Sequence, residues 1–571
     1  MAFHIALNMA GAVSAGAYTA GVLDFLVEAI DEWYEERENQ RRLHGDDIQS
    51  WTIPAHEVML DVMTGASAGG MCAAIGSVAL REEFDHVRQT NPPAGVPVNR
   101  LYQSWVQTID ILKLLGTQDL PDHEGPVRSI LDSTPIDRIA ETALRPDRAR
   151  LRRRLWIAPE MTAILTLSNL RGIPYSVAQA SGSYEERIAY HADQIQFTIA
   201  EQGAADTPTT VAVNYSDPPD SHGWKTLQSA AMATGAFPVM LASRALVRRK
   251  GDYENRQWHI ANAESDGAGQ CESVTKIEPS WGVPDVPATF GNVYADGGVT
   301  NNNPFECARR FLTVAAGNES GRNPREPENA NAAVISIAPF PGDEPFDLNY
   351  DTREQSELIN VLKALLGALV SQSRFQGEEL KLTQDENVSS RFAIAPSDDT
   401  SPTQPALLCG VFSAFGGFIE EKFRDRDYQL GRRNCQQFLR THFVLPEDNV
   451  AIAAGLAKKA EILDSFRREY GQQIDGRWWY SIVPLMQQLR TEIAVPPREA
   501  FKTTEARLEQ VADTATNRLK TVLHAFVRQP GQEHGGWSFL ISAVFDLGGA
   551  SKIKDFILDK LKSELRRSGQ L

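Results

Sequence analysis

The chain has 571 residues, of which 42% are hydrophobic and 23% charged, and its formal net charge at pH 7 is −17. This composition is ordinary for globular proteins, and the length exceeds the ~100–200 residues of one domain. The acidic balance argues against a general nucleic-acid binder, which needs a basic surface to contact phosphates. Attraction to an anionic membrane would therefore require a local basic patch.

The N-terminal segment is apolar, but it does not resemble a signal peptide. No Lys or Arg precedes Arg37, and Asp24 and Glu28 interrupt the apolar stretch. No run of ~18 apolar residues occurs, so no membrane-spanning helix is expected. The five cysteines are scattered, odd in number and without C-x-x-C spacing, which is typical of a reducing compartment and gives no sign of zinc. We therefore expect a cytoplasmic protein without a metal or cofactor.

The first predicted unit is a strand over residues 3–9, a loop of small residues from Gly11 to Gly16, and a helix over about residues 17–38. Backbone N–H groups that converge at the start of such a helix favour an anion. The loop could hold a phosphate, stabilise an oxyanion, or form a plain tight turn. Neither G-x-x-x-x-G-K-[ST] nor G-x-G-x-x-G is present, which disfavours a nucleotide.

The second unit, MLDVMTGASAGGM at residues 59–71, has the form of a nucleophile elbow. An apolar strand leads into a tight turn with Ser67 at its tip, and a helix follows to about residue 81. Gly65 and Gly69 have no side chain to collide as the strand turns into the helix. Two strand–loop–helix units within 80 residues predict an α/β sheet with parallel strands, whose loops open on one edge.

The middle of the chain predicts a mostly helical region over about residues 81–154 and strands at 161–169, 175–180 and 194–199. A helix at 225–232 and a surface loop at about 263–287 follow. Residues 293–304, VYADGGVTNNNP, predict a strand that delivers Asp296 into a turn at Gly297 and Gly298, before a helix that begins at Pro304. An acidic residue at such a turn is usually only a turn former, and the ligand pattern of a calcium loop is missing.

The remainder predicts a strand at 333–337, a helix at 358–369, a strand near 391–395, and mainly helices from about residue 430. The last helix, 551–567, has an apolar face and a net charge of +3, from six basic and three acidic residues. It could lie on an anionic membrane surface, but packing of its apolar face on the protein is the favoured interpretation.

Three of these segments, in this order, resemble the patatin-like phospholipases, whose members carry a glycine-rich oxyanion loop, then G-x-S-x-G, then D-G-[GA]. The corresponding segments are Gly11–Gly16, Gly65–Gly69 and Asp296–Gly298. The sequence ATGAFP at 233–238 is similar to a segment that the family carries before its aspartate.

The glycine loop departs from the family pattern G-G-G-x-[RK]-G, because Gly11 and Gly16 are kept while the residues between them are Ala, Val, Ser and Ala. The basic residue is therefore missing, although the backbone amides remain. Val13 is β-branched, so its position is expected not to need a positive φ. Residues 374–375 and 427–432 resemble those of larger bacterial members.

The resemblance implies an α/β fold: a three-layer, mostly parallel sheet with helices on both faces. We expect a catalytic domain over residues 1–345 and a mainly helical region over 346–571 that contributes one strand near 391–395.

The resemblance also implies a lipid acyl hydrolase of phospholipase A or lysophospholipase type, acting through an acyl-enzyme. Ser67 would be the nucleophile and Asp296 its base, without a histidine. The oxyanion hole would be formed by backbone amides at Gly11, Ala12, Val13 and Ala68. The expected substrate is a phospholipid or another acyl ester, with peripheral contact to the inner membrane surface, and an oligomer stays open.

Two alternatives remain. One is a Ser-His-Asp esterase of the α/β-hydrolase type, in which His442 or His524 would follow Asp296 in the chain order that this fold uses. The other is a binding or scaffold protein with a patatin fold, in which the altered glycine loop reflects lost catalysis.

Overall fold

The computed structural model of the chain describes residues 2–571 except positions 91, 93–97, 121–125, 179–184, 262–271, 319–321, 341–350, 358–359, 362–363, 366–367, 369–370, 374–387, 401–403, 413 and 528–548. The predicted helix at 358–369 falls largely outside the described residues, as do residues 374–375.

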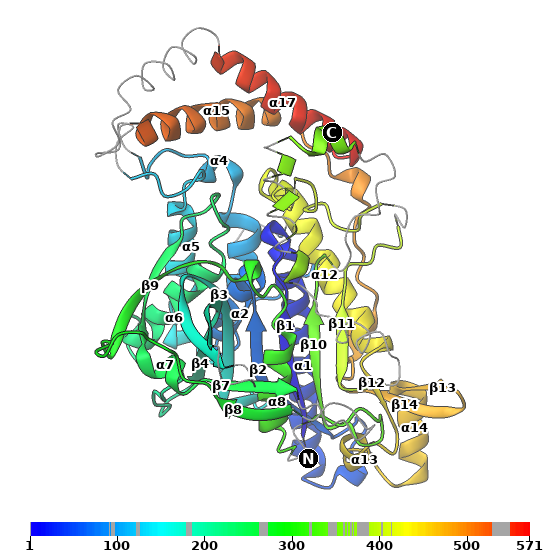
Figure 1. The fold of residues 1–571 in the computed structure, drawn as a ribbon. Coiled ribbons are helices and arrows are strands. Elements are labelled where there is room, and N and C mark those ends of the chain that lie inside the picture. Colours follow the sequence, from blue (N-terminus) through cyan, green and yellow to red (C-terminus); the bar gives the residue numbers. More distant parts are fainter. Residues whose placement is uncertain are drawn as a thin grey trace.

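A central sheet organises the molecule (Figure 1), in the strand order β11-β10-β1-β2-β3-β4-β5. The first five strands in this order are parallel, β4 runs antiparallel to β3, and β5 is parallel to β4. A further pair, β6 and β9, joins the sheet because β9 runs antiparallel to β3. The strand bounds are Ala2–Met9 (β1), Glu57–Gly65 (β2), Ile157–Ala178 (β3), Glu185–Ala200 (β4), Thr210–Asn214 (β5), Arg244–Arg249 (β6), Thr289–Asp296 (β9), Ala332–Ile337 (β10) and Arg391–Ile394 (β11).

Helices cover both faces of this sheet. On one face α8 (Phe305–Ala315) packs on β1, β2 and β10 through a small apolar cluster that includes Phe305 and Leu312. The largest apolar core includes residues of α1 (Gly16–His44), α2 (Ser67–Ala79) and α6 (His222–Thr234), and α2 and α6 both contact β3. The predicted three-layer, mostly parallel α/β fold is thus confirmed.

Several local predictions were wrong. The region 81–154 holds only short helices: α3 (Arg100–Tyr102), a π-helix (Gln103–Thr108), α4 (Ile111–Leu114) and α5 (Thr134–Ala143). The expected loop at 263–287 contains β8 (Glu272–Lys276), which pairs with β7 (Gln257–Ala261). The C-terminal part is mainly helical as predicted, but it also contains a three-stranded sheet that was not predicted: β12 (Val444–Pro446), β14 (Arg477–Ser481) and β13 (Gly471–Ile474). The pairing of β7 with β8 and that of β12, β14 and β13 depend on contacts between segments, which short-range periodicity does not reveal.

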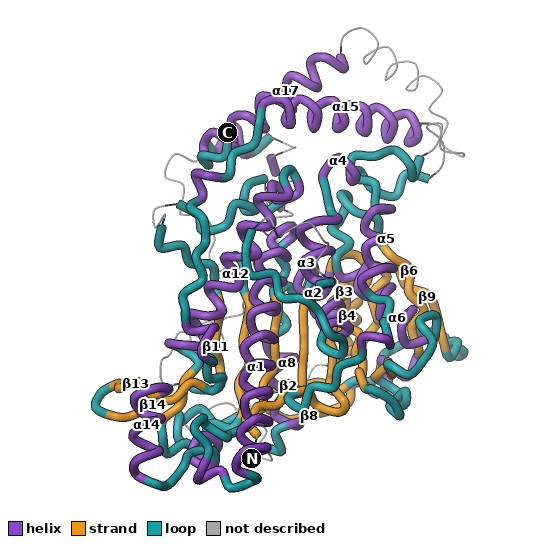
Figure 2. Tube along the Cα trace, turned by 180° about the vertical axis from the view of Figure 1, so that it is seen from behind, coloured by secondary structure: helices purple, strands orange, loops and turns teal. Residues whose placement is uncertain are grey.

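One helix of the described residues, Val13–His44, is long and apolar enough to span a bilayer by length and composition. Its most apolar window is 94% buried inside the protein, and a buried core helix passes the same test. Figure 2 shows α1 lying along the sheet beside α12 (Glu421–Thr441) of the C-terminal region.

Helices α1 and α12 approach each other at two glycines. A methyl group on Gly21 would lie 1.9 Å from the carbonyl oxygen of Tyr428, and one on Gly431 would lie 2.2 Å from that of Tyr18. No side chain fits between the two backbones at these points. The C-terminal region is therefore packed directly against the helix that follows the glycine loop.

A buried ion cluster joins the same two helices. The Arg432 guanidinium of α12 contacts the carboxylates of Asp24 and Glu28 on α1, and all three side chains are buried. Burial acts to raise the pKa of Asp24, but Arg432 and His86 outweigh it and lower the pKa to about 2. Asp24 and Glu28, which interrupt the apolar N-terminal stretch, thus have a structural role.

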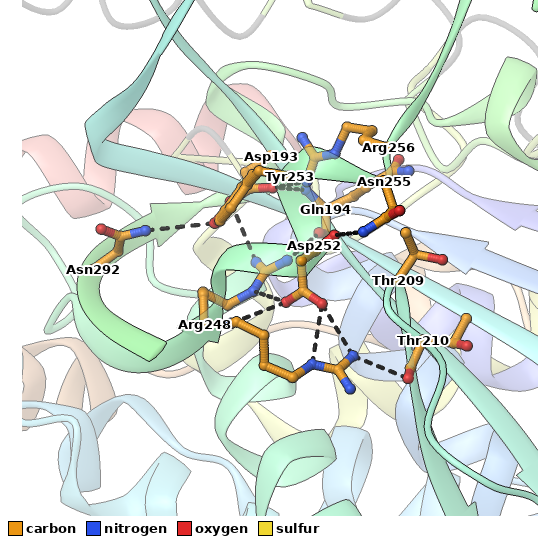
Figure 3. Close-up of polar contacts among 12 residues, drawn as sticks. Asp193, Gln194, Thr209, Thr210, Arg248, Asp252, Tyr253, Asn255, Arg256 and Asn292 are labelled. Atoms are coloured by element: carbon orange, nitrogen blue, oxygen red, sulfur yellow. Dashed lines mark hydrogen bonds and ion pairs between the residues drawn. The ribbon is translucent and has the colours of Figure 1, made fainter. Parts of the chain in front are cut away.

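A second buried cluster holds the strands β4, β6 and β9 together (Figure 3). Asp193 of β4 accepts hydrogen bonds from the hydroxyls of Tyr253 (2.8 Å) and Tyr294 (3.1 Å), and it pairs with Arg248 and Arg256. Burial would raise the pKa of Asp193, but the two arginines lower it to about 2. Because β9 ends at Asp296, this cluster fixes the strand that carries the predicted base.

The last two helices, α15 (Glu505–Val527) and α17 (Ala550–Arg567), form a hairpin over the end of the molecule toward which the parallel strands point (Figure 1). Leu565 of α17 is fully buried. Lys554 and Lys562 pair with Asp513 and Glu505 of α15. The helix α17 thus packs on the protein through Leu565, Leu558 and Leu561, whereas Phe556 of its predicted apolar face is 65% exposed, so the packing favoured from the sequence is found for only part of that face.

The contact between α1 and α12 predicts that Gly431→Ala lowers the free energy of unfolding by about 1–3 kcal/mol, because the added methyl group would overlap a backbone carbonyl. Helix propensity alone would favour alanine by ~1 kcal/mol, so the sign of the change is diagnostic. Chemical denaturation measures it. Gly291→Ala is the matched control, since nothing lies within 4 Å of the added methyl group. A Gly431→Ala protein as stable as the wild type would contradict the close approach.

Candidate active site

Ser67 stands at a sharp turn between β2 and α2. Its φ is +51°, in a region that non-glycine residues rarely adopt. A methyl group on Gly65 would lie 2.4 Å from the carbonyl oxygen of Gly69, and one on Gly69 would lie 2.2 Å from that of Met9. Both glycines are therefore required by close backbone contacts, and the strained turn presents the Ser67 hydroxyl at the N-terminus of α2.

Asp296, at the end of β9, lies directly beside Ser67. The Ser67 hydroxyl donates a hydrogen bond of 2.6 Å to Oδ2 of Asp296, across 229 positions of sequence. The other carboxylate oxygen, Oδ1, accepts a bond of 2.7 Å from the backbone N–H of Gly298. Burial raises the pKa of Asp296 to about 7, although these two hydrogen bonds act to lower it.

The segment 233–238 forms hydrogen bonds with the backbone N–H groups of both Ser67 and Asp296. The backbone N–H of Ser67 donates to the hydroxyl of Thr234 (3.1 Å), and the N–H of Asp296 donates to the carbonyl of Ala236 (2.9 Å). The sequence analysis did not assign a role to Thr234. Its signal was the ATGAFP segment, in which it occupies the second position.

The glycine loop reaches Ser67 from β1. The N–H of Gly11 donates to the carbonyl of Asn302 (3.2 Å), so this amide is engaged, and the prediction of an oxyanion donor at Gly11 is corrected. A methyl group on Gly11 would lie 3.0 Å from Cβ of Ser67, so glycine is needed there for close packing. The amides of Ala12, Val13 and Ala68 have no acceptor among the residues that the structure describes.

Val13 has a φ of +47°, contrary to the expectation that a β-branched residue would avoid such a conformation. A contact from the C-terminal region holds the loop in place. Both the N–H and the hydroxyl of Ser14 donate to the carbonyl of Ala414, and the Ser14 hydroxyl accepts from the N–H of Gly417 (3.1 Å). At the other end of the loop, a methyl group on Gly16 would lie 2.4 Å from the Trp105 ring.

An apolar cavity of about 50 Å³ opens beside the dyad, and Val13, Ser67, Ala68 and Asp296 form part of its wall. The rest of its wall is almost entirely apolar and comes from α2, the π-helix and the residue that follows it, α4, α5, the segment 235–241 and the C-terminal region. These residues include Trp105, Ile109, Leu114, Ile136, Ile139, Phe237, Leu241, Phe415 and Phe418. The Ser67 hydroxyl and the Asp296 carboxylate thus adjoin a cavity suited to hydrocarbon.

The patatin-like phospholipase family profile matches residues 7–309, which is more than half of the chain and includes the glycine loop, the elbow and the aspartate turn. The chain belongs to the patatin-like phospholipases. It is also similar to an uncharacterised protein, y4iI, of Sinorhizobium fredii. The two are 30% identical over 626 aligned residues, which cover 100% of this chain and 82% of that protein. In general terms, this patatin-like phospholipase is a lipid acyl hydrolase.

The two histidines of the Ser-His-Asp alternative do not lie beside Ser67 and Asp296 in this patatin-like phospholipase. His442 is exposed at the end of α12, and His524 belongs to α15. In the described part of the chain, no imidazole hydrogen-bonds to Ser67 or Asp296. The geometry therefore gives no support to the Ser-His-Asp alternative. No cluster of metal-ligating side chains occurs among the described residues either.

The raised pKa of Asp296 predicts a pH-dependent gain in stability for Asp296→Asn. Asp296 ionises near pH 4 in the unfolded chain but only near pH 7 in the folded protein. The free energy of unfolding of the wild type therefore falls as the pH rises through this window. A shift of roughly three units corresponds to about 4 kcal/mol. Asp296→Asn is expected to be more stable than the wild type by up to this amount at pH 8, and the difference should shrink toward pH 4.

Denaturant unfolding at several pH values measures this difference. Asp285→Asn, at an exposed position, is the control and should show no such pH dependence. An Asp296→Asn protein whose stability relative to the wild type is constant from pH 4 to pH 8 would show that burial does not raise this pKa.

Proposed function

We propose that this chain cleaves fatty-acyl esters of phospholipids or lysophospholipids through Ser67 and Asp296, by way of an acyl-enzyme. The observation that carries the proposal is the 2.6 Å hydrogen bond between the Ser67 hydroxyl and a buried carboxylate, at the wall of an apolar cavity. A serine hydroxyl is a weak nucleophile until a hydrogen-bonded base accepts its proton. Asp296 has the position for this task.

In the first half of the reaction, the proton of the Ser67 hydroxyl passes to Oδ2 of Asp296 while Oγ attacks the acyl carbon. The tetrahedral oxyanion accepts hydrogen bonds from the amides of Ala12, Val13 and Ala68, and one such donor is typically worth ~2.7–4 kcal/mol. When the ester bond breaks, Asp296 returns the proton to the leaving alcohol. In the second half, water attacks the acyl-enzyme and the same proton transfers release a carboxylic acid and free Ser67.

The pKa of Asp296 supports this role. A general base works best when its pKa lies near the operating pH, and a pKa of about 7 is far closer to that condition than the 3.8 of an ordinary aspartate. The carboxylate is therefore a much stronger base than an exposed one, yet it remains partly ionised at neutral pH. This removes the need for an intervening histidine.

The cavity supports an acyl substrate. Its volume of about 50 Å³ is well below the ~300–1,000 Å³ of typical ligand pockets, so a fatty-acyl chain would have to displace wall side chains. The partly buried ring of Phe415, which contacts Phe237 edge to face with ring centroids 5.8 Å apart, is one such wall side chain. The substrate's polar head would stay outside this apolar wall.

We further propose that the enzyme works in the cytoplasm and meets its substrate at the inner membrane surface. The scattered cysteines, which are typical of a reducing compartment, support the cytoplasm.

The dyad predicts that Ser67→Ala and Asp296→Asn each abolish ester hydrolysis while the fold is kept. The measurement is the release of fatty acid and lysolipid from mixed phospholipids, read by mass spectrometry, with circular dichroism to verify folding. His442→Ala and His524→Ala are matched controls and should keep full activity. Full activity in Asp296→Asn would contradict the Ser-Asp mechanism. Loss of activity in either histidine variant would favour the Ser-His-Asp mechanism instead. A Ser67 that fluorophosphonates do not label in folded protein would favour a scaffold.

The cavity wall predicts that Phe415→Ala shifts the preferred acyl chain toward greater length, because truncation of the ring enlarges the cavity. Each additional buried methylene group contributes ~0.8 kcal/mol, or about a fourfold gain in kcat/KM. The measurement is kcat/KM across nitrophenyl esters of increasing chain length. Phe392→Ala, in the core away from the cavity, is the control. An unchanged chain-length profile would exclude Phe415 from the acyl site.

A further inference from the structure

A second groove lies at the end of the central sheet opposite the active site. Val58 at the start of β2 and Trp156 directly before β3 belong to its wall, whereas Ser67 follows the far end of β2. The groove has a volume of about 340 Å³, which lies within the ~300–1,000 Å³ of typical ligand sites and far exceeds that of the cavity beside Ser67. It is therefore large enough to hold a small molecule without displacement of its wall.

Charged side chains from α1, β2 and the segment 152–154 form most of this wall, as five arginines and four acidic residues. Its buried part has more positive than negative charge. Arg37 and Arg154 have side chains only 7% and 2% exposed, and Asp31 is the one acidic side chain of the groove that is buried to this degree. Ion pairs of exposed carboxylates contribute little, and the other three are more than half exposed: Glu35, Glu38 and Glu57.

Three of the guanidiniums keep N–H groups without an acceptor. In Arg37, Nη2 donates to the carbonyl of Ala55 (3.1 Å) and to Glu57 (3.0 Å), while Nε and Nη1 have no hydrogen-bond partner among the described residues. In Arg154, Nε and Nη1 are engaged, but Nη2 is not. Arg153 is exposed and makes no hydrogen bond or ion pair in the described part of the chain. Unpaired donors from two segments thus meet in one groove.

These donors indicate the chemistry of a ligand. A guanidinium presents its N–H groups in a planar fork that matches the oxygens of a phosphate or a carboxylate. A phosphate group has three acceptor oxygens, whereas a carboxylate has two in one plane, so phosphate is better suited to donors that come from several arginines. Apolar surface in the same wall, from Tyr34, Leu155 and Trp156, is suited to the organic part of such a molecule.

We propose that this groove binds a water-soluble organic phosphate through Arg37, Arg153 and Arg154. The phosphate oxygens accept from Nη1 of Arg37, Nη2 of Arg154 and the guanidinium of Arg153, while the exposed Glu57 yields its place beside Arg37 to the ligand. A lipid head group would supply the same chemistry, but a bilayer held at this groove would lie at the opposite end of the sheet from Ser67. The site is separate from the dyad and does not depend on the proposed function.

Isothermal titration calorimetry of the full chain tests the proposal, with inorganic pyrophosphate and adenosine triphosphate as probes in 0.15 M salt. We expect saturable binding of one molecule of the triphosphate with a Kd below ~1 mM. Arg153→Ala should weaken this binding about 10-fold, as for the loss of a charge-assisted hydrogen bond, and should fold normally because the side chain has no partner. Arg145→Ala is the matched control, since Arg145 is also exposed and unpaired among the described residues but lies outside the groove.

Glu57→Gln should change the affinity in the opposite direction. It removes the carboxylate that competes with the ligand for Arg37, so we expect binding to become about 3-fold tighter. Glu141→Gln removes the same charge from an exposed position of α5, outside the groove, and should leave the Kd unchanged. Unchanged binding in Glu57→Gln would contradict a ligand that contacts Arg37.

Absence of saturable binding of both probes to the wild type would overturn the proposal. Equal weakening in Arg153→Ala and Arg145→Ala would reveal attraction to surface charge in general, and would overturn it as well. Sedimentation with vesicles that contain phosphatidic acid tests the lipid source: Arg153-dependent binding to vesicles without binding of the soluble probes would exclude a water-soluble ligand. Ser67→Ala should bind the probes as the wild type does, so these outcomes are distinct from a failure of the proposed function.

Discussion

The structure depends on one constraint: the carboxyl group of Asp296 is buried without a cation beside it among the described residues. Asp24 and Asp193 are also buried, but arginines hold the pKa of each at about 2. Asp296 has no such partner among the described residues, and its pKa rises to about 7. An unpaired buried carboxylate is costly, so other parts of the fold must keep it in place. Its backbone is fixed by β3 and by Ala236, and one of its oxygens is fixed by Gly298.

The two strained residues of the site are likewise kept in place by the groups around them. Ser67 and Val13 both have a positive φ, and such conformations persist only where the surroundings determine them strongly. For Ser67 the surroundings are Gly65, Gly69 and Thr234. For Val13 they include Ser14, whose bonds to Ala414 and Gly417 come from beyond the residues that match the family profile.

The C-terminal region is thus part of the site. Its helix α12 is packed against α1 without intervening side chains at Gly21 and Gly431, and α1 begins where the glycine loop ends. Its loop supplies Phe415 and Phe418 to the cavity. The altered glycine loop, which lacks the family's basic residue, is therefore held by residues that lie beyond the match to the family profile. The domain boundary that the sequence predicts near residue 345 remains a prediction.

The sequence by itself determined the local geometry. Gly65, Gly69 and Gly297 lie where backbone meets backbone, and such positions leave a signature because no other residue fits. Short apolar runs and helical spacing likewise predicted the parallel strands and the two helices that follow the loops. Only the tertiary structure decided which distant groups meet: the contact of Ser67 with Asp296 across 229 positions, the engagement of the Gly11 amide by Asn302, and the place of Phe415 in the cavity wall. Side-chain burial, and with it the raised pKa of Asp296, arises from all of these contacts at once and has no counterpart in any short stretch of sequence.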